Sequence, residues 1–428
     1  MFDRLRAGRA TGLVLFATAF ALRAIYVATG DGRTPFELDR AGGTLAVHGE
    51  IKNVLGPFSG PSAHLMPLPV LLRAALEWLF VPRTQASWYA AAMVWTAAAS
   101  LTIALLPTLA KKLRLSEAAA VIAGMVLAVT PFGLWLDSGP GHETALVSLA
   151  LMAVILLFLD GRAARWQDGT AIVKFCAVCG VAALLSPPVL LAALALLGLD
   201  LVTSRDTRGH VVRTGALVAM TVVVALLPWI YRNYLLFGEF IPLRSNFGLE
   251  LHLGNHAHAD GRTYAPSFET MHPFTDSAER EVLIRMGEPA YMRSKLAAAK
   301  TWIRDNPLEF AGLSLHRARQ TWLPSPAMWE RTQAPNARMM RSAWYSIIGF
   351  LALLELFRLW WFRHPAIPLL LVIIVAYSAV YWVTHVDMRY AHPLAGLRTL
   401  LAAQFLVTLA LGRWASVSFQ NGPGTNLR

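Results

Sequence analysis

Residues 36–69 read FELDRAGGTLAVHGEIKNVLGPFSGPSAHLMPLP, and the interpretation of the whole chain starts from this stretch. Two carboxylates, Glu37 and Asp39, come shortly after the first apolar segment. A passage rich in Gly, Pro and Ser then turns the chain back into another apolar run. Acidic side chains beside a membrane span are unusual when packing is their only purpose. We therefore interpret residues 30–86 as a loop that carries chemistry.

The composition predicts an all-α integral membrane protein. Of the 428 residues, 56% are apolar and only 15% are charged, whereas soluble domains carry about 25% charged residues. A helix needs about 20 apolar residues to cross a bilayer, and several segments approach this length. We expect about ten transmembrane helices. They lie near residues 11–29, 87–110, 117–136, 142–160, 171–186, 188–203, 214–231, 342–360, 366–384 and 395–412.

Basic residues predict the orientation of these helices. The net charge is +12, and the basic residues gather in every second short loop, as in Lys111, Lys112 and Arg114. The short loops on the other side contain a single basic residue, Arg389. Positively charged loops stay in the cytoplasm, so we expect both termini there. Clusters of this kind contact membrane lipids, and no stripe typical of nucleic-acid binding is present.

The run 65–81 is ambiguous, because it contains Pro67, Pro69, Arg73 and Glu77. If it crossed the membrane, every later loop would change sides and the charge rule would fail. We therefore expect a helix that lies in the membrane interface.

The predicted organisation has three parts. Residues 1–231 form an N-terminal transmembrane module that includes the outer loop 30–86, residues 232–341 form a small helical outer domain, and residues 342–428 form the C-terminal transmembrane helices. Helix signals support the middle part, since Asp276 and Glu279 have capping-box spacing. Pro289 and Pro307 occupy positions typical of a first helical turn.

Two features bear on alternative functions. Cys176 and Cys179 are spaced like a redox pair, but packing inside an apolar helix is the better interpretation. Arg23 and Glu355 are the main ionisable residues within the spans, and the sequence offers neither a partner. Spans so poor in charge argue against a lipid-linked-sugar transporter or flippase. An O-antigen polymerase or ligase remains a rival, with essential arginines in the large loop and no need for Glu37.

Three short motifs resemble a known family. They are Glu37-Leu38-Asp39-Arg40 with Gly60-Pro61-Ser62-Ala63-His64 and Pro67-Leu68-Pro69; Pro228-Trp229-Ile230-Tyr231-Arg232-Asn233-Tyr234 with Phe237-Gly238, residues 242–248, Leu251 and Gly254-Asn255; and Asp387-Met388-Arg389-Tyr390 with Pro393. In this order they are similar to bacterial polytopic glycosyltransferases of the GT-C fold, relatives of the protein O-mannosyltransferases and of the lipid A aminoarabinose transferase.

The resemblance implies an inverting transfer of one sugar from a polyprenyl-phosphate-linked donor. The acceptor would be a glycan, a lipid or a protein at the outer face of the bacterial cytoplasmic membrane. Many relatives have an Asp-Glu or Asp-Ser pair in the first loop, with a tyrosine one turn later. Here Glu37 and Asp39 are separated and no such tyrosine follows, so the choice of catalytic carboxylate stays open.

Candidate roles follow from side-chain chemistry and from the family pattern. Glu37 is the first candidate for the general base and Asp39 the second, with a helix cap as the alternative role of Asp39. Guanidinium groups recognise phosphate, so the candidates for the carrier phosphate are Arg389, Arg232 and Arg244, with an interfacial anchor as the alternative for Arg232.

The candidates for substrate binding are Asn246, Asn255, His256 and Tyr390. In the family, an acidic residue at the position of Glu143 helps to hold a metal, so Glu143 and His142 are candidate ligands of Mg²⁺ or Mn²⁺. A charge favourable at a helix N-terminus is the alternative for Glu143. We expect His48 and His64 to be loop residues without a ligand role.

Overall fold

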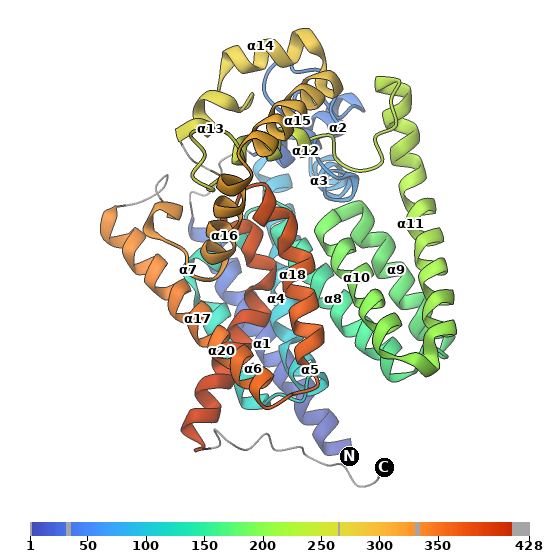
Figure 1. Cartoon of the computed structure of the whole chain (residues 1–428), viewed down its shortest axis with the longest axis vertical. Coiled ribbons are helices and arrows are strands. Elements are labelled where there is room, and N and C mark those ends of the chain that lie inside the picture. The colour runs from blue at the N-terminus through green and yellow to red at the C-terminus, as the bar shows by residue number, and fades with distance from the viewer. Residues whose placement is uncertain (1, 31–35, 264–265, 330–333, 413–428) are drawn as a thin grey trace.

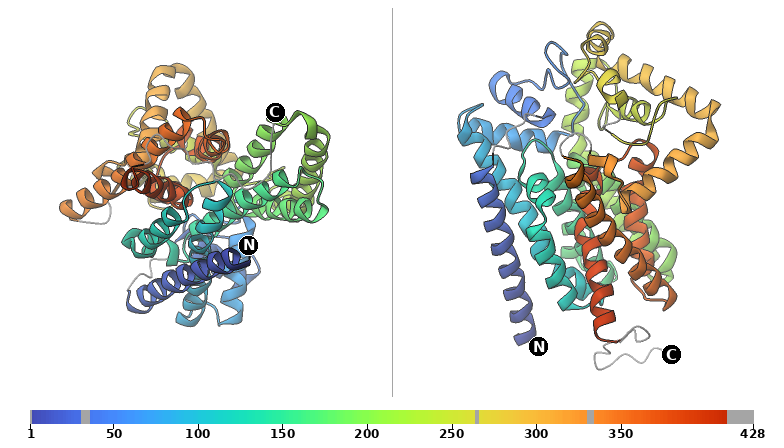
Figure 2. Two further views of the ribbon diagram at one scale, coloured as in Figure 1. Left: turned by 90° about the horizontal axis from the view of Figure 1, so that it is seen from below. Right: turned by 90° about the vertical axis from the view of Figure 1, so that its left-hand side faces the viewer.

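A computed structural model describes residues 2–30, 36–263, 266–329 and 334–412, and in these residues the chain is built from helices joined by loops (Figure 1). Long helices form a bundle, and shorter helices cover one of its ends. The N-terminal end of α1 and the C-terminal end of α20 both lie at the other end, as Figure 1 and the right view of Figure 2 show.

All ten predicted apolar segments are helical. They are α1 (Phe2–Thr29), α4 (Gln85–Ala104) with α5 (Leu106–Lys112), α6 (Glu117–Val129) with α7 (Pro131–Ser138), α8 (Thr144–Ala163), α9 (Gly169–Leu185), α10 (Pro187–Thr203), α11 (Arg208–Phe237) after η1 (Arg205–Thr207), α17 (Pro335–Trp361), α18 (Ile367–Val383), and α19 (Met388–Ala391) with η3 (His392–Leu394) and α20 (Ala395–Ala410). Within the described residues, 6 helices are long and apolar enough to cross a membrane, and the number is 7 if the α6–α7 pair, bent by 73°, is counted as one span. Helices α9, α10 and α18 are shorter. The chain is a multi-pass membrane protein.

Small side chains let these helices pack closely, as is common within membranes. Helix α1 packs against α4 and α6, and α20 packs against α6 and α17. At the α1–α6 contact, a Cβ atom added to Gly124 would lie 2.8 Å from Cδ2 of Leu15. Cys176 and Cys179 are buried in α9, in agreement with a packing role.

The charges within the spans do have partners, contrary to what the sequence indicates. Arg23 lies 2.6 Å from Asp137, and Nε2 of His392 lies 2.7 Å from the other oxygen of Asp137. Glu355 pairs with Arg358 at 2.8 Å. Asp137 is 114 residues away from Arg23, and for this reason no local pattern could reveal the contact.

We call the end of the bundle opposite the N-terminal end of α1 the outer end, and it is built from helices that lie outside the spans. They are α2 (Glu37–His48), α3 (Pro67–Leu79), α12 (Phe247–Gly254), α13 (Pro266–Met271), α14 (Ser277–Met286), α15 (Glu288–Asp305), α16 (Pro307–Trp322) and η2 (Pro326–Trp329). Asp276 accepts a hydrogen bond from the backbone of Glu279 at 2.7 Å, and α15 and α16 carry prolines in their first turns. These predicted helix starts are confirmed.

Helix α3 corresponds to the ambiguous run and is not among the candidate spans of the described chain. It packs against α2. Its Arg73 and Glu77 form a buried ion pair at 2.6 Å, and Arg73 also lies 3.0 Å from Asp39. The charges of α3 therefore fasten it to α2, while Trp78 remains exposed. This arrangement fits the predicted interfacial helix.

Candidate active site

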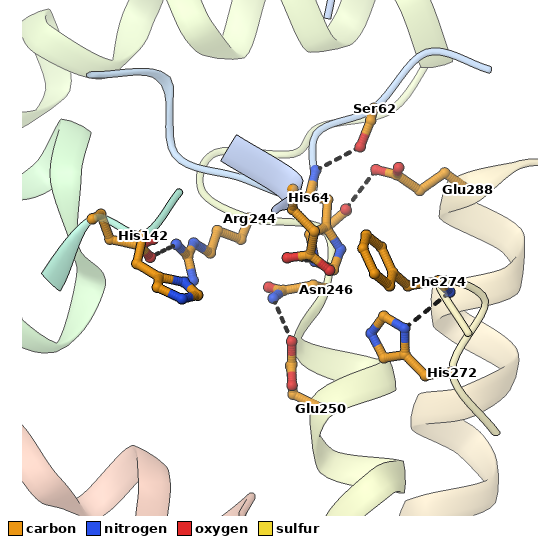
Figure 3. A network of polar contacts seen from close by, with 12 residues as sticks. Ser62, His64, His142, Arg244, Asn246, Glu250, His272, Phe274 and Glu288 are labelled. Carbon is orange, nitrogen blue, oxygen red and sulfur yellow. Dashed lines mark hydrogen bonds and ion pairs between the residues drawn. The ribbon is translucent and has the colours of Figure 1, made fainter. Parts of the chain in front are cut away.

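One polar cluster at the outer end collects side chains from segments that are far apart in the sequence. We call it the outer polar cluster, and it comprises Glu37, His64, His142, Glu143, Arg244, Asn246, Glu250, His272, His385, Arg389 and Tyr390. Figure 3 shows His64, Asn246, Glu250 and His272 gathered together, with His142 and Arg244 to one side. The three motifs of the sequence meet here.

Backbone contacts fix the segment that carries His64. Lys52 and Pro61 form an isolated antiparallel bridge. Beyond it, Nη1 of Arg232 donates to the carbonyl of Ser62 at 2.8 Å. The buried carboxylate of Glu288 accepts hydrogen bonds from the backbone of Ala63 at 2.7 Å and from the Ser245 hydroxyl at 2.6 Å. The loop is thus held by side chains from residues 232–288, and these contacts place the neighbouring His64 ring.

Glu37 and His64 form a charged pair inside the cluster. Their Oε2 and Nε2 atoms lie 3.5 Å apart, and the Glu37 side chain is 25% exposed while that of His64 is 2% exposed. Burial alone would raise the pKa of Glu37, but the charges of His64, His272 and Arg389 outweigh it and lower this pKa to about 2. Burial likewise disfavours the charged form of His64, yet Glu37 and other carboxylates raise the pKa of His64.

Asp39 has a different environment, although it lies on the same helix. One of its oxygens lies 3.0 Å from Nε of Arg73, and the other accepts a hydrogen bond from the backbone of Phe36 at 3.2 Å. Burial raises the pKa of Asp39 in spite of Arg73. Helix α2 begins at Glu37 with Phe36 as its N-cap, so Asp39 lies in the first turn and is not the N-cap of a helix starting near Arg40. The Asp39 side chain instead joins the start of α2 to α3.

Arg389 contacts two other members of the cluster, His142 and Tyr390. Its helix α19 begins with a cap in which Asp387 accepts from the Arg389 backbone at 2.7 Å. Nη2 of Arg389 donates to the Tyr390 hydroxyl at 2.7 Å, and Nη1 lies 3.3 Å from Nδ1 of His142. Burial and the charge of Arg389 lower the pKa of His142 to about 3, so this ring is neutral at pH 7.

Several members of the cluster had no clear signal in the sequence. Nε2 of His385 lies 2.5 Å from Glu250, and its Nδ1 lies 2.7 Å from the Thr263 hydroxyl. Burial lowers the pKa of His272 to about 4. His64, expected to be an ordinary loop residue, faces Glu37 instead. A possible signal for His385 is its position directly before the motif of Asp387 and Arg389.

The residues present do not fit the predicted divalent metal. Among the described residues, no group of three or more His, Cys, Asp or Glu side chains could hold a metal ion. Glu143 is paired with Arg244, and His142 faces Arg389. Two guanidinium groups beside the two expected ligands repel a cation. No step below therefore involves a metal.

Other predicted residues lie elsewhere or have structural contacts. Besides Ser62, Arg232 donates to the carbonyl of Ile51 at 3.3 Å, and its guanidinium lies 4.9 Å from the centroid of the Trp229 ring. Asn255 is fully buried and donates to two backbone carbonyls. His256 lies near His252, outside the cluster. The two candidates that remain lie in the cluster: Asn246 donates to Glu250 at 2.9 Å, and Tyr390 stacks on Tyr381 at 4.6 Å.

Comparison with known proteins relates this architecture to solved structures. No protein-family model matches the chain, and no curated protein matches it in sequence. The archaeal oligosaccharyltransferase AglB from Archaeoglobus fulgidus, in complex with an inhibitory peptide and a dolichol-phosphate, is similar with a TM-score of 0.55 and 12% identity, over 99% of this chain and 53% of AglB. The apo form of the Archaeoglobus fulgidus oligosaccharyltransferase gives a TM-score of 0.54 and 14% identity, over 95% and 51%.

A weaker similarity links the chain to ArnT from Cupriavidus metallidurans bound to undecaprenyl phosphate. The TM-score is 0.42 and the identity 16%, over 94% of this chain and 78% of ArnT. The chain spans about half the length of the oligosaccharyltransferases. Similarity over nearly the whole chain confirms the expected GT-C-like fold.

Proposed function

We propose that the chain is a membrane glycosyltransferase that transfers a sugar from a polyprenyl-phosphate-linked donor to an acceptor of the bacterial envelope. The observation that carries this proposal is the meeting of the Glu37 carboxylate and the Arg389 guanidinium in one outer polar cluster. Arg389 is near enough for its charge to lower the pKa of Glu37. A carboxylate and a guanidinium at the outer end of a GT-C-like bundle match the needs of glycosyl transfer from a phosphate.

In this mechanism Glu37 acts on the acceptor hydroxyl. The oxygen of the acceptor attacks the anomeric carbon, the bond from this carbon to the phosphate oxygen breaks, and Glu37 takes the hydroxyl proton. With a pKa of about 2, Glu37 is a weak base, but it is ionised throughout the physiological range. Asp39 remains the second candidate, although its oxygens are engaged by Arg73 and by the backbone of Phe36.

The departing polyprenyl phosphate gains negative charge as the glycosidic bond breaks. Arg389 can bind it with two parallel N–H groups, and a cation that is already in place stabilises the charge without reorganisation. His142 and Tyr390 hold the guanidinium group in position. Arg244 is a weaker candidate because Glu143 already engages it, and Arg232 is weaker still because backbone carbonyls engage its donors.

The outer helices would keep water from competing with the acceptor. The 60–66 segment is held through Glu288, and the His272 ring beside α13 lies 6.5 Å from the His64 ring, centroid to centroid. The carrier would approach from the membrane, and dolichol-phosphate, the ligand of the similar AglB structure, is a lipid of this class. With both termini in the cytoplasm, the cluster faces the outside of the cytoplasmic membrane.

The test incubates the purified full-length chain in detergent with a panel of polyprenyl-phosphate sugars and with an envelope extract that supplies glycan, lipid and protein acceptors. Mass spectrometry measures the polyprenyl phosphate released. We expect one donor to be consumed by the wild type and not by Arg389→Ala. If no donor is consumed, and vesicles containing the protein instead move a lipid-linked sugar across the bilayer, the protein is a transporter and the proposal fails.

A further inference from the structure

A cavity inside the bundle shares no lining residue with the outer polar cluster. Its lining comes mainly from α1, α4, α7, α17 and α20. Arg398, on its wall, lies in the first turn of α20, beyond Arg389 in the chain. The cavity therefore lies among the spans, near their outer ends. The lining residues used below are Arg23, Asp137, Trp344, Ile348, His392 and Arg398.

Buried nitrogen atoms on the lining side chains have no hydrogen-bond partner in the described part of the chain. They include Nε of Arg23 and Nε of Arg398. These two side chains are only 1% and 3% exposed. An unsatisfied buried donor costs about 1–3 kcal/mol, and more when it is charged. Two guanidinium donors on one cavity therefore indicate a polar occupant that accepts hydrogen bonds.

The charges on the lining favour an anion. Asp137 neutralises Arg23 at 2.6 Å and also contacts His392. Arg398 donates to the carbonyl of Thr321 at 2.8 Å, and within the described residues it forms no ion pair with a carboxylate. Arginine stays charged at any accessible pH. The C-terminal end of α16, to which Thr321 belongs, offers at most about half a compensating charge.

The cavity borders the exposed face of α17 that carries Trp344 and Ile348. This helix packs mainly against α20. Its Trp344 lines the cavity and is 44% exposed, while Ile348 lies one turn further along the same face. On a membrane-spanning helix such an exposed face meets lipid, and tryptophan favours the depth of the headgroups. An occupant can thus enter sideways from the bilayer.

We propose that this cavity binds the anionic phosphate group of a membrane lipid, with Arg398 as its ligand. Guanidinium groups match phosphate oxygens in geometry and charge, and basic pockets between transmembrane helices are suited to lipid headgroups. The hydrocarbon chains stay in the bilayer beside Trp344 and Ile348. This site does not depend on the catalytic role proposed for Glu37.

The test is native mass spectrometry of the full chain in mild detergent. The probes are phosphatidylglycerol, undecaprenyl phosphate, orthophosphate and, as a zwitterionic control, phosphatidylcholine. We expect Arg398→Gln to bind an anionic lipid at least about tenfold more weakly than the wild type. The matched control Arg213→Gln removes an exposed arginine of α11 and is expected to bind like the wild type. The probe that shows this difference identifies the source of the phosphate.

Two further variants keep the outcome decisive. Ile348→Trp narrows the entrance without removing a charge, and it replaces Arg398→Gln if that variant does not fold. Arg389→Gln weakens lipid binding at the outer polar cluster alone. The binding lost in this variant is therefore measured separately from the binding lost in Arg398→Gln. Equal binding of every anionic probe by the wild type and by the folded Arg398→Gln or Ile348→Trp variant would overturn the proposal, whatever the result for catalysis.

Discussion

Oε2 of Glu37 lies 3.5 Å from Nε2 of His64, and this pair joins the first residue of α2 to the segment that precedes α3. Each partner favours the charged form of the other. The pair also connects the two parts of the first motif, which 26 intervening residues separate in the printed sequence. Both the stability of the outer end and the proposed chemistry depend on it.

The pair makes stability depend on pH in a defined direction. The pKa of Glu37 is lowered from 4.5 to about 2, so its contribution is present above pH 4.5 and is lost as the pH falls towards 2. The pKa of His64 is raised from 6.5, so its contribution is complete below pH 6.5 and is lost as the pH rises through the raised value.

We therefore expect His64→Gln to lower the Tm most between pH 4.5 and 6.5. The difference from the wild type should shrink at higher pH. Thermal unfolding in detergent over this range measures the effect, with His48→Gln as an exposed control. A loss of Tm that stays the same from about pH 5 to about pH 9 would show that His64 contributes packing alone.

The Arg389→Lys variant tests the role of the guanidinium group. Lysine keeps the positive charge but cannot bind phosphate with two parallel N–H groups. We expect kcat to fall about 100-fold with little change in Tm. Steady-state transfer kinetics measure this, with Arg304→Lys as an exposed control. An unchanged kcat would remove Arg389 from the mechanism.

Glu288→Ala should loosen the outer loop. It leaves the buried backbone N–H of Ala63 without its partner, and such a group costs about 1–3 kcal/mol. We expect a free energy of unfolding lower by about 2 kcal/mol and weaker transfer, because His64 is displaced together with Ala63. Glu281→Ala, an exposed change in α14, serves as the control. Lower stability with full activity would separate this anchor from the site.

Asp137→Asn tests the buried charges of the bundle. It removes the partner that neutralises Arg23, and breaking a buried ion pair costs about 3–5 kcal/mol. Asp160→Asn breaks a partly exposed pair with Lys112 and should cost less than about 1 kcal/mol. Chemical unfolding in detergent compares the two. A similar loss of unfolding free energy in the two variants would mean that water reaches Asp137.

Much of the architecture could be predicted from the sequence. Apolar length locates all ten helical segments, and the helix starts at Asp276, Pro289 and Pro307 follow from local capping chemistry. The choice of an interfacial helix for residues 65–81 rests on charge patterning alone. These signals work because they act over a few turns of one helix.

The contacts of the site could not be predicted in the same way. Glu250 and His385 are 135 residues apart in the sequence, and neither lies in a motif that indicates the other. Asn255 resembles a polar site residue in sequence, but it is used to join α12 to the end of α18. Pairings of this kind depend on how distant helices pack, and a single sequence does not encode that in any local pattern.

The central claim is that Glu37 acts on the acceptor at an outer glycosyl-transfer site. The most direct measurement compares cells that carry the wild type, Glu37→Gln or Asp39→Asn at matched expression, with mass spectrometry of the envelope glycans and of the lipid-linked sugars. We expect Glu37→Gln to lose one sugar from a glycan and to accumulate its polyprenyl-phosphate donor, while Asp39→Asn keeps part of the activity. Wild-type glycans in the Glu37→Gln cells would contradict the account.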